Sequence, residues 1–284
     1  MNDTSTLPQP TQLPPPASPA PSPVPERPSR GVRLAWFTPG AILAIAALGW
    51  GTYNILSLLA HSEYTSTDTF AASDVASLDM WNENGSMTVN PTDGDEITVV
   101  AEVSNGWRST EVSSRIVGNQ LVVRGGCPTF VSPWCWVDFT VEIPADRPMT
   151  VTGSNGSVDI RGATGSLDVT TDNGSIDLVD VSGNVRASSD NGRITGRGMT
   201  SAVVDTATDN GRIELSFLDP PQTVSARTSN GRIEVIVPDD DVLYRVDLRT
   251  SNGSTDNLVR TDPASDHVIE LSTDNGSITL RPPS

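Results

Sequence analysis

Two cysteines and two tryptophans are the residues whose types and spacing point most directly to chemistry. Cys127 and Cys135 enclose a short segment that ends in Trp134, and Trp136 follows the second cysteine. This close spacing favours one disulfide that closes a short loop. Exposed tryptophans on such a loop would be rigid contacts for a ligand. Buried ones would instead cap the apolar end of the fold, and the sequence leaves both alternatives open.

Metal chemistry is the rival explanation of the cysteine pair. It would require further Cys or His ligands, and the only histidines are His61 and His267. Repeated acidic turns can bind Ca²⁺, and four Asp-Asn-Gly turns begin at Asp172, Asp190, Asp209 and Asp274. Asp and Asn are also favoured in turns for backbone reasons, and neither the glycine-rich calcium repeat nor an EF-hand loop is present. We therefore predict no metal site and no cofactor.

Catalytic motifs are scarce. All 18 basic residues are Arg, so Schiff-base chemistry on Lys is excluded, and two His leave few general bases. No Gly-x-Ser-x-Gly nucleophile motif stands out. Acidic residues are abundant, however, and a carboxylate pair that hydrolyses or cleaves glycans stays open as an alternative. We predict a protein that is not an enzyme.

A series of Asn-Gly dipeptides indicates the structural elements that position these residues. Seven of them recur at steps of 18, 18, 19, 20, 22 and 23 residues, after two less regular ones at Asn84 and Asn105. The seven begin at Asn155, Asn173, Asn191, Asn210, Asn230, Asn252 and Asn275. A period of about 20 residues is typical of repeat architectures.

Apolar and polar residues alternate on both sides of each Asn-Gly. Six residues before each Asn stands an apolar residue, and three after it stands Val or Ile in every unit except that of Asn252, which has Thr255. Period-two alternation predicts a short strand on either side of each dipeptide, with one face buried. Asn-Gly could close a hairpin, or it could form the corner of a coil that stacks on its neighbours.

The aligned positions favour stacked coils. Thr or Ser stands two residues before six of the seven Asn, and Arg193, Arg212 and Arg232 share one outward position. Glu214 and Glu234 stand beside two of these Arg, where they would relieve repulsion between stacked cations. The Asn side chains can hydrogen-bond along a stack. In the unit of Asn252, Leu258 is expected to fill the space that Asn257 leaves.

The N-terminal part has a different composition. Residues 1–33 are rich in Pro, Ser and Thr, which predicts a disordered tail. Residues 34–60 contain no charged residue and are long enough for a transmembrane helix. Three Arg precede this segment, so we expect a single-pass anchor with the N-terminus in the cytoplasm and residues 61–284 outside. This outer part carries 15 Arg against 33 acidic residues, which argues against nucleic acid as a partner.

Residues 75–280 resemble the DUF4097 family of adhesin-like proteins. The resemblance rests on Val75-Ala76-Ser77-Leu78-Asp79 before Asn84-Gly85-Ser86, on Thr92-Asp93-Gly94-Asp95-Glu96, and on Val141-Glu142-Ile143-Pro144-Ala145 before the regular units. It implies an all-β, β-helix-like fold on a membrane-attached or secreted bacterial protein, and it implies no catalytic residues.

Together these observations predict an all-β protein, a β-solenoid of Asn-Gly-punctuated coils. We expect a tail at 1–33, a transmembrane helix at 34–60, a linker at 61–74 and the solenoid at 75–284. The expected function is a non-enzymatic, membrane-anchored cell-surface adhesin or binding scaffold. Its partners would be the lipid bilayer through residues 34–60 and a cell-wall, glycan or protein ligand outside. An envelope sensor that signals through the tail and a carbohydrate-active enzyme are the alternatives.

Overall fold

The computed structural model describes residues 30–59, 62–105, 110–127, 135–238 and 241–283. The chain divides into two compact units, residues 1–52 and 53–284, and each is described by itself. Most of the tail predicted at 1–33, and Trp134 in the cysteine loop, lie outside the described residues.

One helix, α1 (Arg30–Leu59), covers the apolar segment. Its stretch Pro39–Leu56 has a mean hydropathy of 1.3, and none of it is buried in the protein. A helix of 18 or more such residues is long and apolar enough to cross a membrane, by length and composition. Pro39 lies inside this helix, at the first residue of the stretch.

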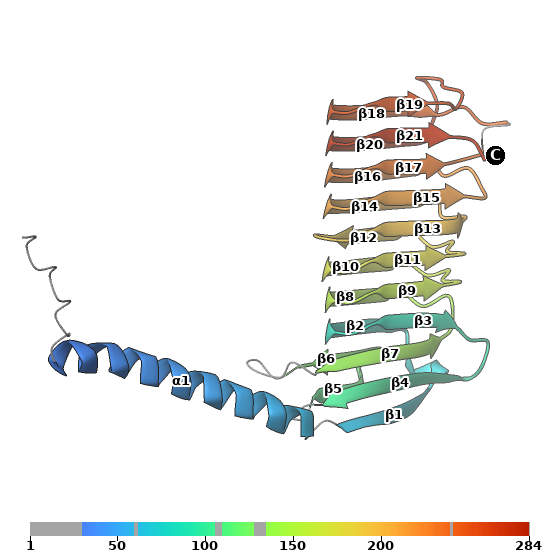
Figure 1. Cartoon of the computed structure of the whole chain (residues 1–284). Coiled ribbons are helices and arrows are strands. Elements are labelled where there is room, and N and C mark those ends of the chain that lie inside the picture. Colours follow the sequence, from blue (N-terminus) through green and yellow to red (C-terminus); the bar gives the residue numbers. More distant parts are fainter. Residues whose placement is uncertain (1–29, 60–61, 106–109, 128–134, 239–240, 284) are drawn as a thin grey trace, which may run out of the picture. The chain divides into compact units, whose positions relative to one another are not determined.

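The rest of the described chain is built from strands in two mixed sheets, which Figure 1 shows as one column of stacked layers. Sheet A has the order β1-β4-β7-β3-β9-β11-β13-β15-β17-β21-β19, and sheet B has the order β18-β20-β16-β14-β12-β10-β8-β2-β6-β5. The strands of sheet A are β1 (Ser62–Ala71), β3 (Met87–Pro91), β4 (Glu96–Asn105), β7 (Trp136–Ile143), β9 (Val158–Arg161), β11 (Ile176–Val179), β13 (Ile194–Met199), β15 (Ile213–Phe217), β17 (Ile233–Ile236), β19 (Thr255–Asn257) and β21 (Ile278–Arg281). Those of sheet B are β2 (Ser77–Asn84), β5 (Glu111–Val117), β6 (Gln120–Gly126), β8 (Met149–Asn155), β10 (Leu167–Asn173), β12 (Val185–Ser189), β14 (Val203–Asn210), β16 (Thr223–Asn230), β18 (Arg245–Asn252) and β20 (Val268–Asn275).

The two strands on either side of each Asn-Gly of the seven regular units lie in different sheets. For Asn210, β14 pairs in parallel with β12 and β16, while β15 pairs in parallel with β13 and β17. Strands joined by a hairpin turn would be antiparallel neighbours in one sheet, so the hairpin alternative is wrong. Each Asn-Gly is a corner at which the chain passes from one sheet to the other.

The alternating apolar positions point between the two sheets and form one continuous core. Val151, Val169, Ile176 and Ile213 are all fully buried there. Polar residues alternate with them on the outer faces, as the burial of β10 and β15 shows. Burial of apolar side chains contributes about 25 cal/mol per Å², so this core is the main favourable term in folding.

The corner asparagines form a continuous ladder of side-chain hydrogen bonds. Asn210 donates from Nδ2 to Oδ1 of Asn191 at 3.0 Å, and its own Oδ1 accepts from Nδ2 of Asn230 at 3.0 Å. Each other internal rung repeats this arrangement. The order along the ladder is Asn84, Asn155, Asn173, Asn191, Asn210, Asn230, Asn275 and Asn252. Asn105, the ninth Asn of an Asn-Gly pair, instead accepts the backbone N–H of Thr110 at 2.7 Å.

The glycine after each ladder Asn is required by close contact between layers. A Cβ on Gly231 would lie 1.6 Å from the carbonyl oxygen of Gly211, a distance that no side chain can take. The same carbonyl accepts a hydrogen bond from Oγ1 of Thr228 at 3.3 Å. Thr250, Thr273 and Thr208 make equivalent bonds to glycine carbonyls. These bonds explain why Thr or Ser recurs two residues before the Asn.

The last two units are exchanged relative to their order in the sequence. β20 and β21 insert between the unit of Asn230 and that of Asn252, so that β18 and β19 end the sheets. This order places Thr255 and Asn257, which are exposed, at the end of the stack and not inside it. The expectation that Leu258 fills the space of Asn257 is wrong, since Leu258 is 64% exposed. A terminal unit needs a polar end, and this unit supplies it.

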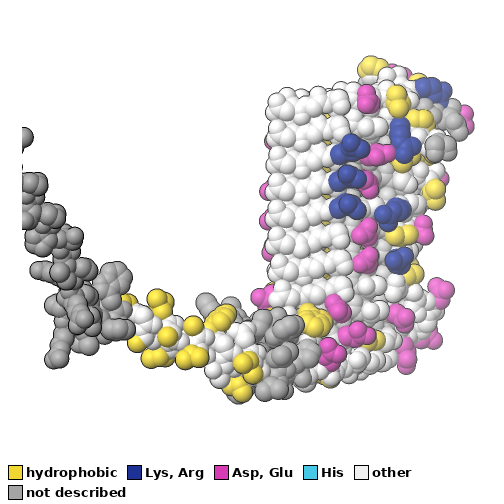
Figure 2. All heavy atoms as spheres, in the orientation of Figure 1, with side chains coloured by type: hydrophobic (Ala, Val, Ile, Leu, Met, Phe, Trp, Pro, Cys, Tyr) yellow, Lys and Arg dark blue, Asp and Glu magenta, His cyan; other side chains and the backbone are white. Residues whose placement is uncertain are grey.

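The outward arginines share one side of sheet A with acidic residues, and Figure 2 shows basic side chains in a column with acids beside them. Nη1 of Arg212 lies 2.9 Å from Oε1 of Glu214, as expected. Glu234 instead accepts from Nε of Arg281 at 3.0 Å, because β21 is the neighbour of β17. These contacts are at least partly exposed and contribute about 0–1 kcal/mol each.

The other end of the stack is antiparallel. β1 pairs with β4 over ten positions, β4 pairs with β7, and β5 pairs with β6. Residues 62–71 of the segment expected to be a linker are therefore a strand. Their apolar content is low because an edge strand buries little of its surface, so the sequence pattern does not reveal them.

Candidate binding surface around the disulfide

Cys127 and Cys135 form a disulfide at the antiparallel end of the stack, as predicted. The S–S distance is 2.07 Å and the Cα atoms are 5.8 Å apart. Cys127 follows β6 in sheet B, and Cys135 precedes β7 in sheet A. The two cysteines thus lie at the end of a sheet B strand and the start of a sheet A strand, as the Asn-Gly residues do in the regular units. A covalent link replaces a rung of the ladder at this corner.

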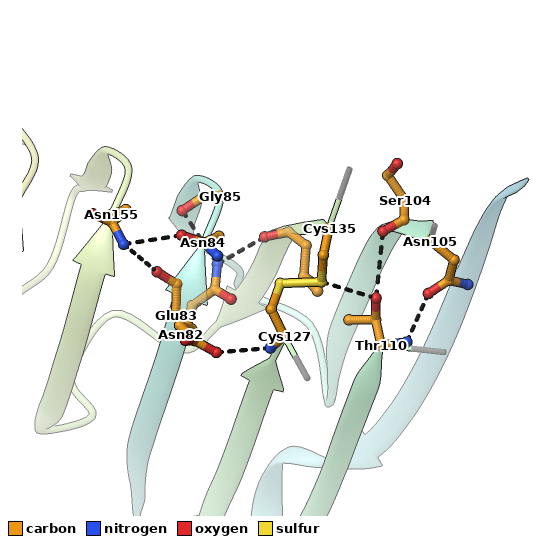
Figure 3. The surroundings of a disulfide bond; sticks show 11 residues. Asn82, Glu83, Asn84, Gly85, Ser104, Asn105, Thr110, Cys127, Cys135 and Asn155 are labelled. Atoms are coloured by element: carbon orange, nitrogen blue, oxygen red, sulfur yellow. Dashed lines mark hydrogen bonds between the residues drawn. A yellow bond between two sulfur atoms is a disulfide. The ribbon is translucent and has the colours of Figure 1, made fainter. Parts of the chain in front are cut away.

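Hydrogen bonds from neighbouring layers hold both cysteines (Figure 3). The backbone N–H of Cys127 donates to Oε2 of Glu83 at 2.9 Å. The hydroxyl of Thr110 lies 3.2 Å from Sγ of Cys135, and the N–H of Thr110 donates to Oδ1 of Asn105. Each cysteine is therefore bound to a different part of the chain, which fixes the base of the loop.

Asn82 positions β7 against this corner. It is 1% exposed, and it stands at the position where most units have Thr or Ser. Its Nδ2 donates to the carbonyl of Val137 at 2.7 Å and to that of Gly85 at 3.2 Å. A longer amide is needed here because it must satisfy two backbone carbonyls from two layers.

Trp136 is the first residue of β7 and is 37% exposed. It lines a hollow of about 350 Å³ on the outer face of sheet A. The antiparallel register places Ser104 opposite Trp136 and Glu63 opposite Ser104, so three strands contribute one row of side chains. The other lining residues are Tyr64, Thr65, Glu102 and Val103.

The hollow combines flat aromatic surface with carboxylates. An indole ring offers a large apolar face at low conformational cost, and carboxylate oxygens accept hydrogen bonds from hydroxyl or amide groups. Glu63 and Glu102 make the hollow acidic. This chemistry suits a ligand that is polar, rich in donors and not anionic.

A second hollow lies on the outer face of sheet B at the same end. It measures about 530 Å³ and is lined by Trp81, Arg124 and the start of β5. Arg124 is held in place by Asp79, with Nη2 2.6 Å from Oδ2. A Cβ on Gly126 would lie 3.6 Å from the Trp81 ring, so the ring lies over the strand just before Cys127. The two exposed or half-buried tryptophans of the described strands thus lie at the disulfide end.

Sequence reasoning found Trp136 but missed its neighbours. Tyr64, Glu63 and Glu102 come from strands outside the regular units, and only the antiparallel register brings them to the same place. No local spacing in the sequence could have linked residue 63 to residue 136. The half-buried Trp81, at an outward position of β2, was a signal that could have been used.

The acidic residues and histidines bear on metal binding. No group of three or more His, Cys, Asp or Glu that could hold a metal ion occurs among the residues that the structure describes. The aspartates of the Asp-Asn-Gly corners, Asp172, Asp190, Asp209 and Asp274, are exposed on the ladder edge. Their neighbouring Asn side chains are used in the ladder.

Comparison with known proteins finds similar solved structures at low sequence identity and no match in sequence. No family model matches this sequence, and no protein of curated function matches it in sequence. A Bacteroides fragilis structure named "putative adhesin" has a TM-score of 0.47 and 13% identity, over 78% of this chain and 98% of that one. A Clostridium sporogenes structure named "putative cell adhesion protein" has a TM-score of 0.39 and 10% identity, over 78% of this chain and 100% of the other.

A third similar structure carries a different name. It is a Parabacteroides distasonis protein named "Putative lipid binding protein", with a TM-score of 0.36 and 12% identity over 76% of this chain and 96% of its own. The names of these proteins refer to adhesion and to lipid binding. At these identities and TM-scores the likenesses carry no residue-level inference for this chain.

Proposed function

We propose that this protein is a non-enzymatic, membrane-anchored binding protein of the cell surface, whose β-solenoid carries its ligand site at the disulfide end. The observation that carries the proposal is the hollow of Trp136, Tyr64, Glu63 and Glu102. Half-exposed aromatic rings beside carboxylates are costly to leave in water and are typical of binding surfaces. Antiparallel pairing of β1 with β4 and of β4 with β7, together with the disulfide before β7, holds the strands that carry these side chains.

The anchor in this proposal is α1. Its apolar stretch spans the bilayer, the three Arg before it stay in the cytoplasm, and residues 61–284 lie outside. The disulfide supports an oxidising location for this part of the chain. The names of the similar structures agree with a surface protein that binds a ligand.

The expected ligand class is a cell-wall fragment, a glycan or a protein segment with exposed donors. The acidic character of the hollow disfavours anionic ligands such as nucleic acid. The outer part as a whole is acidic as well, with a chain net charge of −17.

The test is a binding screen with the full chain in nanodiscs against wall fragments, glycans and matrix proteins. We expect Trp136→Ala to weaken binding of any ligand found by about 10-fold or more, since central aromatic contacts contribute about 2 kcal/mol or more. Trp81→Ala, on the other sheet, is the matched control and should leave that binding unchanged. Equal loss in both variants, or no ligand at all, would reject the proposed site.

An envelope sensor is the second candidate, and the Pro-rich tail before α1 is the observation that favours it. Deletion of residues 1–29 separates the two. A binding scaffold keeps its ligand binding and its phenotype in cells, whereas a sensor keeps binding and loses its downstream response.

A further inference from the structure

Asn-Gly is the dipeptide most prone to spontaneous deamidation, because glycine leaves the following backbone nitrogen free to approach the side chain. That nitrogen attacks Cγ of Asn and forms an N–Cγ bond. The bond from Cγ to Nδ2 breaks, and Nδ2 leaves as ammonia. Water then opens the cyclic imide to Asp or isoaspartate. The net reaction adds one water and releases one ammonia, so it needs no oxidant and no enzyme.

The fold requires an Asn-Gly pair, and with it this reactivity, in every layer of the ladder. The glycines cannot be replaced, since a Cβ at Gly211 or Gly276 would lie 1.8 Å from a carbonyl oxygen of the next layer. The asparagines cannot be replaced without loss of the ladder, since each internal rung both donates and accepts. The reactive pair is therefore retained at eight corners.

The same stack restrains the reaction at most corners. At Asn230, the attacking nitrogen of Gly231 donates its hydrogen to the carbonyl of Asn275 at 3.0 Å. The Nδ2 of Asn230 is bound to Asn210, and its Oδ1 is bound to Asn275. Ring closure must break these bonds. The nitrogens of Gly85, Gly156, Gly211 and Gly276 are held in the same way.

Asn173 and Asn191 are restrained by their side chains. Asn191 donates to Asn173 at 3.1 Å and accepts from Asn210 at 3.0 Å, so its amide is held on both sides. The N–H of Gly192 donates to no backbone carbonyl of the neighbouring layer among the described residues. This corner thus depends on the ladder alone.

Asn252 lacks the backbone restraint and one of the two side-chain hydrogen bonds of an internal rung. It ends the ladder, donates to Oδ1 of Asn275 at 3.0 Å, and receives no donor on its own Oδ1 from the described residues. β18 is the last strand of its sheet, and within the described part of the chain no carbonyl of a further layer accepts from the N–H of Gly253. Asn252 is also exposed to the water that the second step consumes.

We propose that Asn252 is a site of spontaneous deamidation, and that the hydrogen-bonded stack protects the other seven ladder asparagines. The product carboxylate has no hydrogen to donate to Asn275, so the last rung is lost while the remaining rungs persist. The modification therefore acts on the terminal unit of β18 and β19 and leaves the core intact.

The test is a time course of the full chain in detergent at mildly alkaline pH, with peptide mapping by mass spectrometry that resolves Asn, Asp and isoaspartate. We expect Asn252 to react about 5-fold faster than Asn84, Asn173 and Asn191, where one more hydrogen bond must open. It should react about 10-fold or more faster than the other four rungs, where at least two more must open. A parallel sample in denaturant should react at similar rates at all eight. A rate at Asn252 no greater than at Asn210, or the same lead in denaturant, would overturn the proposal.

The variant Asn210→Ala provides a second test within the native fold. It removes the donor to Oδ1 of Asn191. The N–H of Gly192, which follows Asn191, already lacks a backbone acceptor among the described residues. Asn191 should then react at a rate close to that of Asn252, while Asn275 stays slow. An unchanged rate at Asn191 would show that the ladder bonds do not protect it. If the variant failed to fold, all rungs would accelerate together and the wild-type time course would decide.

Discussion

The side-chain amide of Asn155 donates to Oδ1 of Asn84 at 3.0 Å, although 71 positions separate the two residues. Between them the chain forms β3 to β7, including the disulfide loop, and then returns to the next layer. The ladder therefore passes without interruption from the first Asn-Gly unit to the regular series. This continuity joins the unit of Asn84 and the regular units in one uninterrupted stack.

The contribution of each Asn of the ladder to the free energy of unfolding can be measured separately. Asn210→Ala removes two hydrogen bonds and should lower the free energy of unfolding by about 1–2 kcal/mol. Asn252→Ala removes one and should cost about half as much. Urea unfolding followed by circular dichroism provides both values. Equal costs would mean that the internal bonds are not formed in solution.

The glycine column should be intolerant of a single methyl group. Gly231→Ala places a Cβ 1.6 Å from the carbonyl oxygen of Gly211, so the layers must separate locally. We expect a loss of about 3 kcal/mol and a lower Tm. Gly94→Ala is the matched control, since its Cβ would meet Oγ1 of Thr92 at an ordinary 3.4 Å. A similar Tm for both variants would contradict the layer spacing.

Loss of the disulfide should destabilise the binding end before the rest of the stack. The double change Cys127→Ser and Cys135→Ser opens a loop with a sequence separation of 8, which we expect to cost about 2–3 kcal/mol. Hydrogen exchange should rise first in β6 and β7. Thr110→Val, which removes only the hydroxyl near Sγ of Cys135, should have a smaller effect. Faster exchange at β18 and not at β7 would argue against this local role.

The exchanged order of the last two units predicts opposite responses at equivalent positions. Leu280 is fully buried between layers, so Leu280→Asn should cost about 3–5 kcal/mol. Asn257, opposite it on the terminal strand, is exposed, and its Oδ1 accepts the N–H of Val259 at 3.2 Å. Asn257→Leu removes this bond alone and should cost about 1 kcal/mol or less. Thermal unfolding of the two variants checks the order. With the units in sequence order, Asn257→Leu would fill the core and stabilise the protein instead.

Much of the fold could be predicted from local patterns. The alternation around Asn173 or Asn230 fixes which side chains are inward, because side chains on a strand alternate between faces whatever the pairing. The spacing of Cys127 and Cys135 restricts the disulfide to a short loop. The recurrence of Thr or Ser two residues before the Asn indicated stacking, and the bonds from Thr208 and Thr228 to glycine carbonyls supply its cause.

The binding surface could be predicted only in part. Trp136 was visible beside a cysteine, but its partners lie on β1 and β4, which carry no Asn-Gly corner of the ladder. Pairing of these strands is antiparallel and is selected by the free edge of β7, a feature of the assembled sheet. Whether Trp136 is a ligand contact or a buried cap of the apolar end also depends on its exposure, which the sequence does not give.

The sequence by itself determined the strands, their inward faces, the corners and the apolar segment, because each of these follows from side-chain type at short spacing. Tertiary structure alone decided which strands are neighbours. It placed the unit of Asn275 before that of Asn252, closed the ladder across the disulfide excursion, and gathered Glu63, Glu102 and Trp136 in one hollow. Neighbouring layers would contribute nearly identical hydrogen bonds in any order. The order of the units is therefore set at the two ends of the stack. At one end a polar unit faces water, and at the other the irregular antiparallel strands complete the sheets.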